Sequence, residues 1–323
     1  MKTPKEAVVL VVGAGTMGCS IAQVFAAYGH KTYMADLKQE FVDNALKRID
    51  GAIDGLIKEG FADESYRDAV KANLHPIVND DIPSIAGEAD VVFEVVFEDP
   101  EVKKGIYKVL NDNCPKDAIF CSNTSGMDVF SVTDGIIENP ERLIITHWFN
   151  PPHLMKLIEV VWGPKTSEAT SNYVRELLEA VDHKPAVLKE FVPGFIVNRI
   201  ATVICRELYY MIDQGWISGE DAENAMRYTD GLRYGFEGPL ALWDFVGLEI
   251  PMTVAKGGVL KSLCNDTDTL PLGEKLLAEG KTGVKAGEGV LKYPSVDEYV
   301  AKRSRRILQM AKVMDEWDKE DAE

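Results

Sequence analysis

A glycine-rich turn near the N-terminus constrains the fold of this chain most strongly. It follows a valine-rich apolar run, residues 7–12, and reads Gly-Ala-Gly-Thr-Met-Gly from Gly13 to Gly18. A continuous apolar run is typical of a strand covered on both faces. Gly13 permits a tight turn, Gly15 lets the backbone approach a pyrophosphate, and Gly18 allows the next helix to pack closely on the strand. The stretch therefore predicts a β-α-β unit whose helix N-terminus binds phosphate.

An acidic residue completes this unit. A second strand expected over residues 31–35 is followed by Asp36, eighteen residues after Gly18. A carboxylate there accepts hydrogen bonds from the adenosine ribose and repels a 2′-phosphate, so it favours NAD over NADP. Lys38 is close enough to soften that preference. A glycine turn beside a solvated aspartate is the alternative, which the complete strand-helix-strand context disfavours.

Two further predicted strands place polar side chains at the same edge of the sheet. Residues 89–97 lead to Glu98, with Lys103 one turn into the following helix, and residues 118–121 lead to a polar run that includes Ser125. Ligands of doubly wound sheets bind at the carboxyl ends of strands. Glu98 and Lys103 are therefore candidates to contact the nicotinamide ribose, and Ser125 to contact a substrate hydroxyl or carbonyl. Solvated loop charges and a loop-forming serine are the alternatives.

A histidine and a glutamate suggest a general base. Two apolar runs, residues 143–145 and 154–161, are predicted strands separated by Asn150-Pro151-Pro152. His147 leaves the first strand, and Glu159 lies inside the second. If the strands are adjacent, the carboxylate can set the imidazole tautomer and stabilise its protonated form. A core histidine beside a chance acid is an equal alternative on these residues alone.

The alternation of strands and helices stops near residue 190. We therefore predict an α/β Rossmann-type N-terminal domain over residues 1–190 and an all-α C-terminal domain over residues 191–323. In the second domain, Asn198 near a helix start could reach a substrate carbonyl, and Arg233 could hold a carboxylate through two hydrogen bonds. An exposed asparagine, and an Arg233 paired with Glu237 or a neighbouring subunit, are the alternatives.

Composition argues against several classes of partner. The formal net charge is −17, whereas nucleic-acid binding depends on Lys and Arg that neutralise phosphates. The chain has no apolar run long enough to cross a bilayer and no apolar signal-peptide core near its start. Its five cysteines are scattered and lack metal-ligand spacing, which favours reduced thiols. We expect a cytoplasmic protein with no nucleic-acid, membrane or metal partner.

Several motifs occur in a specific order along the chain: residues 13–18, 122–125, 147–151, 155–160, 193–199, 238–239 and 287–289. Through this set the chain resembles the 3-hydroxyacyl-CoA dehydrogenase family over nearly its whole length. The resemblance implies a Rossmann-type domain, a helical domain that supplies most of a homodimer interface, and an active site between them. It also implies NAD-dependent oxidation of the β-hydroxyl of a small-molecule substrate.

The same resemblance implies residue roles. His147 would be the catalytic base and Glu159 its partner, while Ser125 and Asn198 would hold the substrate oxygens. The positions that match cofactor contacts are Gly13, Gly15, Thr16, Met17, Gly18, Asp36, Glu98, Lys103 and Asn150. The histidine would take the hydroxyl proton as hydride leaves for the nicotinamide.

Departures from the family pattern leave the substrate open between an L-3-hydroxyacyl-CoA, such as 3-hydroxybutyryl-CoA, and a free hydroxy acid. Acyl-CoA members bind the CoA phosphates with a hydroxyl residue and a lysine near the end of the long second helix. At that place this chain offers only Lys58 as a basic residue. Three features resemble L-gulonate and carnitine dehydrogenases: Pro151-Pro152, residues 231–234 and the helix beyond Tyr293. Residues 155–157 and 195–198 follow the acyl-CoA form.

Two more distant alternatives stay open. The chain could bind NADH without turning over a substrate, as the resemblance to lambda-crystallin suggests. It could instead belong with 6-phosphogluconate and 3-hydroxyisobutyrate dehydrogenases, which share the glycine turn. Their catalytic lysine would be expected within residues 193–199, where this chain has none.

Overall fold

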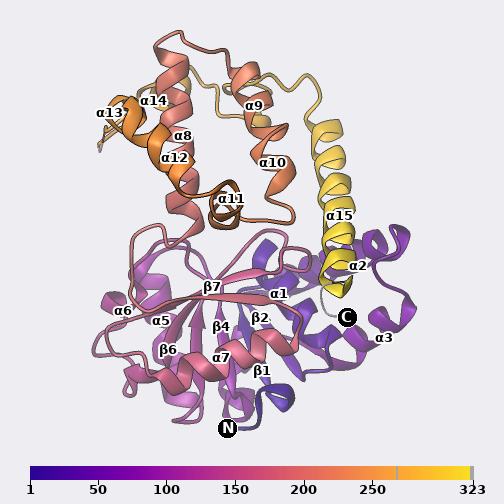
Figure 1. Ribbon diagram of the computed structural model, residues 1–323. Coiled ribbons are helices and arrows are strands. Elements are labelled where there is room, and N and C mark those ends of the chain that lie inside the picture. The colour runs from indigo at the N-terminus through magenta and orange to yellow at the C-terminus, as the bar shows by residue number, and fades with distance from the viewer. Residues whose placement is uncertain (267, 321–323) are drawn as a thin grey trace. The chain divides into compact units, whose positions relative to one another are not determined.

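The computed structural model describes residues 1–266 and 268–320 (Figure 1). Its internal contacts divide the chain into two compact units, Met1–Ile196 and Val197–Glu323. The division falls a few residues beyond residue 190, at the start of the first helix of the second unit.

Unit 1 is built on one eight-stranded sheet with the order β3-β2-β1-β4-β5-β6-β7-β8. The strands are β1 (Val9–Val12), β2 (Thr32–Asp36), β3 (Leu74–Val78), β4 (Val91–Glu94), β5 (Ile119–Ser122), β6 (Leu143–Trp148), β7 (Leu157–Trp162) and β8 (Lys184–Leu188). All neighbours are parallel except β6 and β7, which run antiparallel. This arrangement confirms the predicted Rossmann-type unit.

The edge strand β3 is an element that the sequence pattern did not reveal. Its sequence, Leu-His-Pro-Ile-Val, contains Pro76, which cannot donate a hydrogen bond to a neighbouring strand. A proline is tolerated here because β3 has β2 as its sheet neighbour on one side and lies at the end of the strand order.

Different helices cover the two faces of the sheet. The helices of unit 1 are α1 (Thr16–Ala27), α2 (Gln39–Lys58), α3 (Glu64–Asn73), α4 (Ile82–Ile85), α5 (Pro100–Asn113), α6 (Val129–Val132) and α7 (Glu168–Ala180). Alternate strand residues point to opposite faces. Val9 and Val11 join one buried cluster with α1, α2, α3 and α7, and Leu10 and Val12 join another with α4, α5 and α6. Figure 1 shows α7 running across the strands of its face.

Helix starts in unit 1 differ in one respect that matters for ligand binding. Asp99 caps α5 by accepting hydrogen bonds from the backbone of Glu101 at 2.9 Å and Val102 at 3.0 Å. Ser167 caps α7 by accepting from Thr170. Helix α1 begins after Gly15, which has no side chain to cap it. The first amide groups of α1 are therefore left to bind an anion.

Unit 2 is helical, which confirms the predicted class. Its helices are α8 (Val197–Asp213), α9 (Gly219–Arg227), α10 (Asp230–Arg233), α11 (Pro239–Val246), α12 (Glu249–Val254), α13 (Leu260–Ser262), α14 (Pro271–Ala278) and α15 (Val296–Glu320). Ser218 caps α9 by accepting a hydrogen bond from the backbone of Asp221 at 3.0 Å. Among the described residues, no helix is both long and apolar enough to cross a membrane.

Candidate active site

The antiparallel pairing of β6 and β7 places His147 directly opposite Glu159. The imidazole Nδ1 lies 2.7 Å from Glu159 Oε2. His147 is 6% exposed and Glu159 is fully buried. Because a carboxylate can only accept, Nδ1 carries the proton of this hydrogen bond and Nε2 is left with a lone pair. This geometry is the one a general base requires.

Two aromatic rings and a backbone amide surround this pair. The ring of Phe149 lies 4.7 Å from the His147 ring, and that of Phe195 lies 5.5 Å from it, measured between centroids. The other oxygen of Glu159 accepts a hydrogen bond from the backbone of Ile196 at 2.7 Å. A buried carboxylate needs such donors to remain ionised.

The glycine turn leaves room for a dinucleotide. Gly13 has a φ of +99°, and an added Cβ would lie 2.5 Å from the Val95 carbonyl oxygen. A Cβ on Gly15, in contrast, would meet nothing within 4 Å. Asp36 accepts hydrogen bonds from the backbone of Ala14 and of Leu37, both at 2.7 Å. Open space at Gly15, an uncapped helix start and a fixed carboxylate together fit an adenine dinucleotide without a 2′-phosphate.

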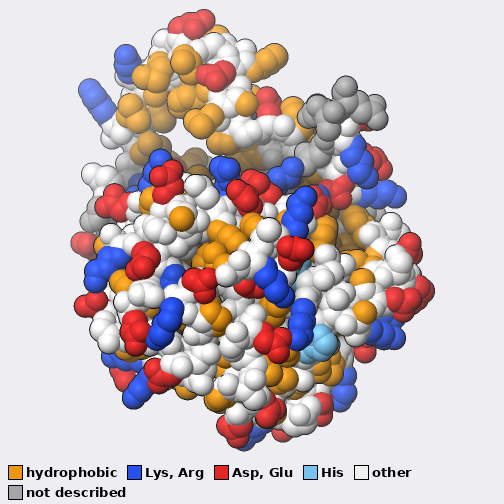
Figure 2. Space-filling model, turned by 90° about the horizontal axis from the view of Figure 1, so that it is seen from below, with side chains coloured by type: hydrophobic (Ala, Val, Ile, Leu, Met, Phe, Trp, Pro, Cys, Tyr) orange, Lys and Arg blue, Asp and Glu red, His pale blue; other side chains and the backbone are white. Residues whose placement is uncertain are grey.

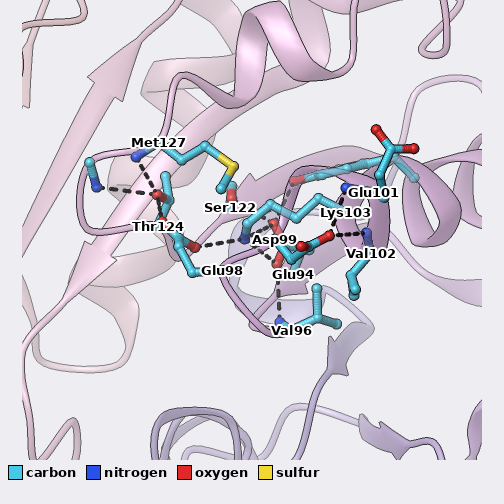
Figure 3. A network of polar contacts seen from close by, with 12 residues as sticks. Glu94, Val96, Glu98, Asp99, Glu101, Val102, Lys103, Ser122, Thr124 and Met127 are labelled. Atoms are coloured by element: carbon cyan, nitrogen blue, oxygen red, sulfur yellow. Dashed lines mark hydrogen bonds and ion pairs between the residues drawn. The ribbon is translucent and has the colours of Figure 1, made fainter.

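Lys103 is buried against Glu94, and does not extend into solvent as a residue that only contacts a ribose would. It is fully buried on α5, and its Nζ lies 2.7 Å and 2.9 Å from the two carboxylate oxygens of Glu94. It also lies 3.2 Å from Glu98, whose side chain is 44% exposed (Figure 3). The structure thus brings Glu98 and Lys103 together. Of the two, Glu98 presents its carboxylate to solvent at the carboxyl edge of the sheet.

Glu94 is a central residue that sequence reasoning missed. Besides Lys103, its carboxylate accepts hydrogen bonds from Ser122 Oγ at 2.6 Å, the Val96 backbone at 3.0 Å and the Tyr107 hydroxyl at 3.3 Å. Burial raises the pKa of Tyr107 well above its usual value, so this hydroxyl keeps its proton and donates. The sequence did contain a clue to this role, because Glu94 is an acid inside an otherwise apolar strand. A buried charge of this kind needs a partner.

The loop after β5 joins this network to β6, the strand that carries His147. The Thr124 hydroxyl donates to Glu98 and accepts from the Met127 backbone at 2.8 Å (Figure 3). Asn123 Oδ1 accepts from the backbone of Trp148, the residue after His147, at 2.9 Å. Ser125 follows as an exposed residue. The structure therefore holds the loop on both sides of Ser125 while leaving that hydroxyl accessible.

The turn between β6 and β7 contains another contact that the sequence did not indicate. His153 Nδ1 lies 2.6 Å from the hydroxyl of Ser20, on the helix that follows the glycine turn. Burial lowers the pKa of His153 to about 4, so it is neutral near pH 7. Asn150, a predicted cofactor residue, is exposed in the same turn. The histidine thereby connects the turn that carries Asn150 to helix α1.

Two predicted residues lie in unit 2. Asn198 is the second residue of α8 and is half-buried. Arg233 ends α10, where its guanidinium lies 3.8 Å from Asp230 and is 45% exposed. Its ion-pair partner among the described residues is Asp230, three residues before it in the chain.

Family models match most of this chain. The NAD binding domain of 3-hydroxyacyl-CoA dehydrogenase matches residues 8–191, and the C-terminal domain matches residues 194–293. The chain belongs to the 3-hydroxyacyl-CoA dehydrogenase family. It is accordingly an NAD-binding oxidoreductase, in agreement with the open glycine turn and Asp36.

Members with different substrates are similar to this protein. The 5-formyl-3-hydroxy-2-methylpyridine 4-carboxylate 5-dehydrogenase of Mesorhizobium japonicum is 29% identical over 310 residues, covering 95% of this chain and 98% of its own. Human mitochondrial hydroxyacyl-coenzyme A dehydrogenase is 32% identical over 289 residues, covering 88% and 90%. A crystal structure of the pyridine-carboxylate enzyme, described as an NAD⁺-dependent dismutase, aligns with a TM-score of 0.86 at 28% identity, covering 96% of this chain and 99% of that chain.

Gly15→Ala is expected to preserve the fold and to weaken cofactor binding. Gly15 has a φ of −65°, which alanine adopts freely, but its Cβ would enter the space through which a pyrophosphate approaches. We expect the Kd for NADH, measured by fluorescence titration, to rise about tenfold. Gly18→Ala is the contrasting variant, since its Cβ would lie 1.7 Å from the Gly13 carbonyl oxygen and disrupt the fold. An unaltered Kd in Gly15→Ala would contradict this cofactor position.

Lys103→Met is expected to destabilise unit 1 strongly. It removes the cation beside the fully buried Glu94, and an unpaired buried charge costs about 3–5 kcal/mol. Lys104→Met is the matched control, because Lys104 pairs with Glu101 on the surface at 2.7 Å and such pairs contribute about 1 kcal/mol or less. Urea unfolding measures both. Equal losses in the two variants would show that the Glu94–Lys103 pair is not the stabilising contact.

Proposed function

We propose that this protein oxidises the hydroxyl of a β-hydroxy compound to a carbonyl, with His147 as the general base. The observation that carries the proposal is the direct pairing of His147 with buried Glu159 at 2.7 Å. Glu159 accepts the hydrogen bond from Nδ1–H, so Nε2 is the nitrogen that takes the hydroxyl proton. The glycine turn and Asp36 supply the NAD site that the reaction needs.

Each protein group has a defined part in this reaction. NAD, when bound, accepts the hydride from the carbinol carbon. His147 Nε2 receives the proton of the hydroxyl, and Glu159 stabilises the resulting imidazolium through a charge-assisted hydrogen bond. We assign Ser125 and Asn198 to the substrate oxygen. In the direction of reduction, the imidazolium returns its proton to the carbonyl oxygen.

His147→Gln tests the base. The substitution retains a polar side chain but removes the group that accepts the proton, so kcat is expected to fall by about 10²- to 10⁴-fold. The Kd for NADH should change little, because the glycine turn follows β1 and Asp36 ends β2, whereas His147 lies on β6. Steady-state kinetics and NADH fluorescence separate the two effects. Wild-type turnover in His147→Gln would exclude this residue as the base.

We infer that L-3-hydroxyacyl-CoA thioesters, such as 3-hydroxybutyryl-CoA, are the first substrate class. The support is the family itself, together with the similarity to human hydroxyacyl-coenzyme A dehydrogenase along 88% of this chain. The proton transfer assigned to the His147–Glu159 pair acts on the β-hydroxyl and does not require the CoA group.

A small free hydroxy acid is the second candidate, because few cations are available near the end of the long second helix. Arg67 on α3 is already bound by Asp54 at 2.7 Å and Glu64 at 2.9 Å, and Lys58 is the exposed base at the end of α2. On the face drawn in Figure 2, Lys and Arg side chains are interspersed with Asp and Glu. With a net charge of −17, the protein would attract a polyanionic CoA group poorly. The similarity to a dehydrogenase named for a pyridine carboxylate also supports a free-acid substrate.

Substrate profiling distinguishes the two classes. NADH formation is measured with 3-hydroxybutyryl-CoA, 3-hydroxybutyrate, gulonate and carnitine at equal ionic strength. A higher kcat/KM for the thioester supports the first class, and a higher value for a free acid supports the second. NADH binding with no turnover of any hydroxy compound would contradict the proposed activity and favour a purely binding role.

Arg233→Met tests the anchoring of a free carboxylate. The guanidinium is 45% exposed, and its distance to Asp230 is long for an ion pair, at 3.8 Å. It can therefore bind a second carboxylate. If a free acid is the substrate, we expect its KM to rise about tenfold. Arg227→Met is the control, since Arg227 lies over the Tyr228 ring on the same part of the chain. Equal KM values in both variants would remove Arg233 from the substrate site.

We propose that the protein forms a homodimer through unit 2 and works in a reducing compartment such as the cytoplasm. Large apolar side chains of α11 and α12 are exposed, including Leu240 at 82% and Phe245 at 85%, which is unusual for a monomer surface. All five cysteines are free thiols. Sedimentation of the wild type against Phe245→Asp tests the association; a monomeric wild type would contradict it.

A further inference from the structure

The segment from Val192 to Ile196 contains an unusual backbone conformation. Phe195 N–H donates to the Val192 carbonyl at 3.0 Å and closes a turn in which Gly194 has a φ of +78°. A proline followed by a glycine is the usual sequence for such a turn. Phe195 then adopts a φ of +51° itself, although a bulky aromatic residue rarely does so. Strain of this kind persists only where surrounding contacts demand it, and it concentrates at functional sites.

The contacts made by this turn converge on the two catalytic side chains. Phe195 is 1% exposed, and its ring meets the His147 ring edge-on, with 61° between the planes. The next residue, Ile196, donates its backbone N–H to Glu159 Oε1 at 2.7 Å. Consecutive residues therefore hold the imidazole and its carboxylate. Both contacts are made at the positive-φ bend, one by Phe195 itself and one by the residue that follows it.

The effect on Glu159 is geometric. One of its oxygens accepts from His147 Nδ1 and the other from Ile196 N–H. Two donors on opposite oxygens prevent the carboxylate from rotating about its terminal bond. The aromatic rings of Phe149 and Phe195 also limit the tilt of the imidazole. Orientation of a base within a few tenths of an ångström strongly affects proton transfer.

We propose that Phe195 is a positioning residue for the His147–Glu159 pair. Its left-handed backbone directs the Ile196 amide to Glu159, and its ring fixes the imidazole so that Nε2 faces the reacting hydroxyl. The proposal rests on the proposed role of His147 as the base. It assigns no direct contact between Phe195 and substrate or cofactor.

Phe195→Leu and Phe191→Leu form a matched pair of variants. Phe191 packs against Phe195 with a centroid distance of 5.9 Å, so both variants lose one ring from the same cluster. Phe195→Leu is expected to lower kcat at least tenfold, with KM and the Kd for NADH within about twofold of the wild type. Phe191→Leu is expected to keep kcat within about twofold. Equal reductions in kcat in the two variants would overturn the proposal.

Proton NMR supplies a readout that does not depend on turnover. The Nδ1 proton shared by His147 and Glu159 should give a strongly downfield resonance in the wild type, absent from His147→Gln. We expect this resonance to broaden or shift in Phe195→Leu and to persist in Phe191→Leu. An unchanged resonance in both variants would refute the positioning role. If the resonance responds as expected but the wild type oxidises no hydroxy compound, the proposed function fails while the positioning of the pair stands.

Glycine and alanine at position 195 separate the ring from the backbone. Both lose the ring, but glycine accepts a positive φ that alanine resists. Phe195→Ala is therefore expected to lower kcat several-fold further than Phe195→Gly. Equal kcat values would show that the backbone does not contribute. If Phe195→Leu does not fold, Phe195→Met, whose flexible side chain fills the same space, replaces it in the comparison.

Discussion

The hydrogen bond between His147 and Glu159 is the interaction on which the rest of the site depends. Glu159 lies in the middle of β7 and is completely buried, where a carboxylate is unstable without donors. The sheet is otherwise parallel around β6, and the reversal of β7 sets the two residues directly opposite one another. A short turn can join antiparallel neighbours, whereas a parallel pair requires a long crossover. The reversal thus brings His147 and Glu159 together although they are twelve residues apart in the chain.

A second buried carboxylate at the same edge of the sheet has a different partner. Glu94 binds the Lys103 ammonium, and Ser122 and Tyr107 complete its hydrogen bonds. Through Ser122, the last residue of β5, the Glu94 cluster fixes the start of the loop that carries Ser125. The two buried carboxylates at this edge thus have different partners, an ammonium for Glu94 and an imidazole for Glu159.

The acidic composition is compatible with a cofactor that carries phosphates. A dinucleotide pyrophosphate is bound chiefly by backbone amides at a helix start, which need no cationic side chain. Helix α1 begins without a side-chain cap, and Gly15 leaves open space beside it. The same composition weighs against a substrate whose recognition requires several lysines or arginines. The negative charge therefore does not oppose NAD binding, which depends on backbone groups of the fold. It does affect substrate binding, which depends on the side chains that line the site.

Patterns close together in the sequence were sufficient for the Rossmann unit, the NAD preference and the candidate base. The spacing of Gly13, Gly15 and Gly18 follows from local backbone sterics, and the strands around His147 and Glu159 follow from apolar runs. The sequence also indicated that these two residues would meet if their strands were neighbours. It did not indicate the proline-containing edge strand β3, because its apolar pattern is interrupted.

Only the tertiary structure decided which groups satisfy the buried polar side chains. It paired Lys103 with Glu94, His153 with Ser20, and the Ile196 amide with Glu159. Such choices depend on how helices pack across a sheet and on the path of the backbone at Phe195, which no short sequence window contains. The sequence by itself determined the family and the cofactor through its motifs, since these are local. The arrangement that holds His147 and Glu159 was determined by packing, since a buried charge can be satisfied by any donor that the fold brings within reach.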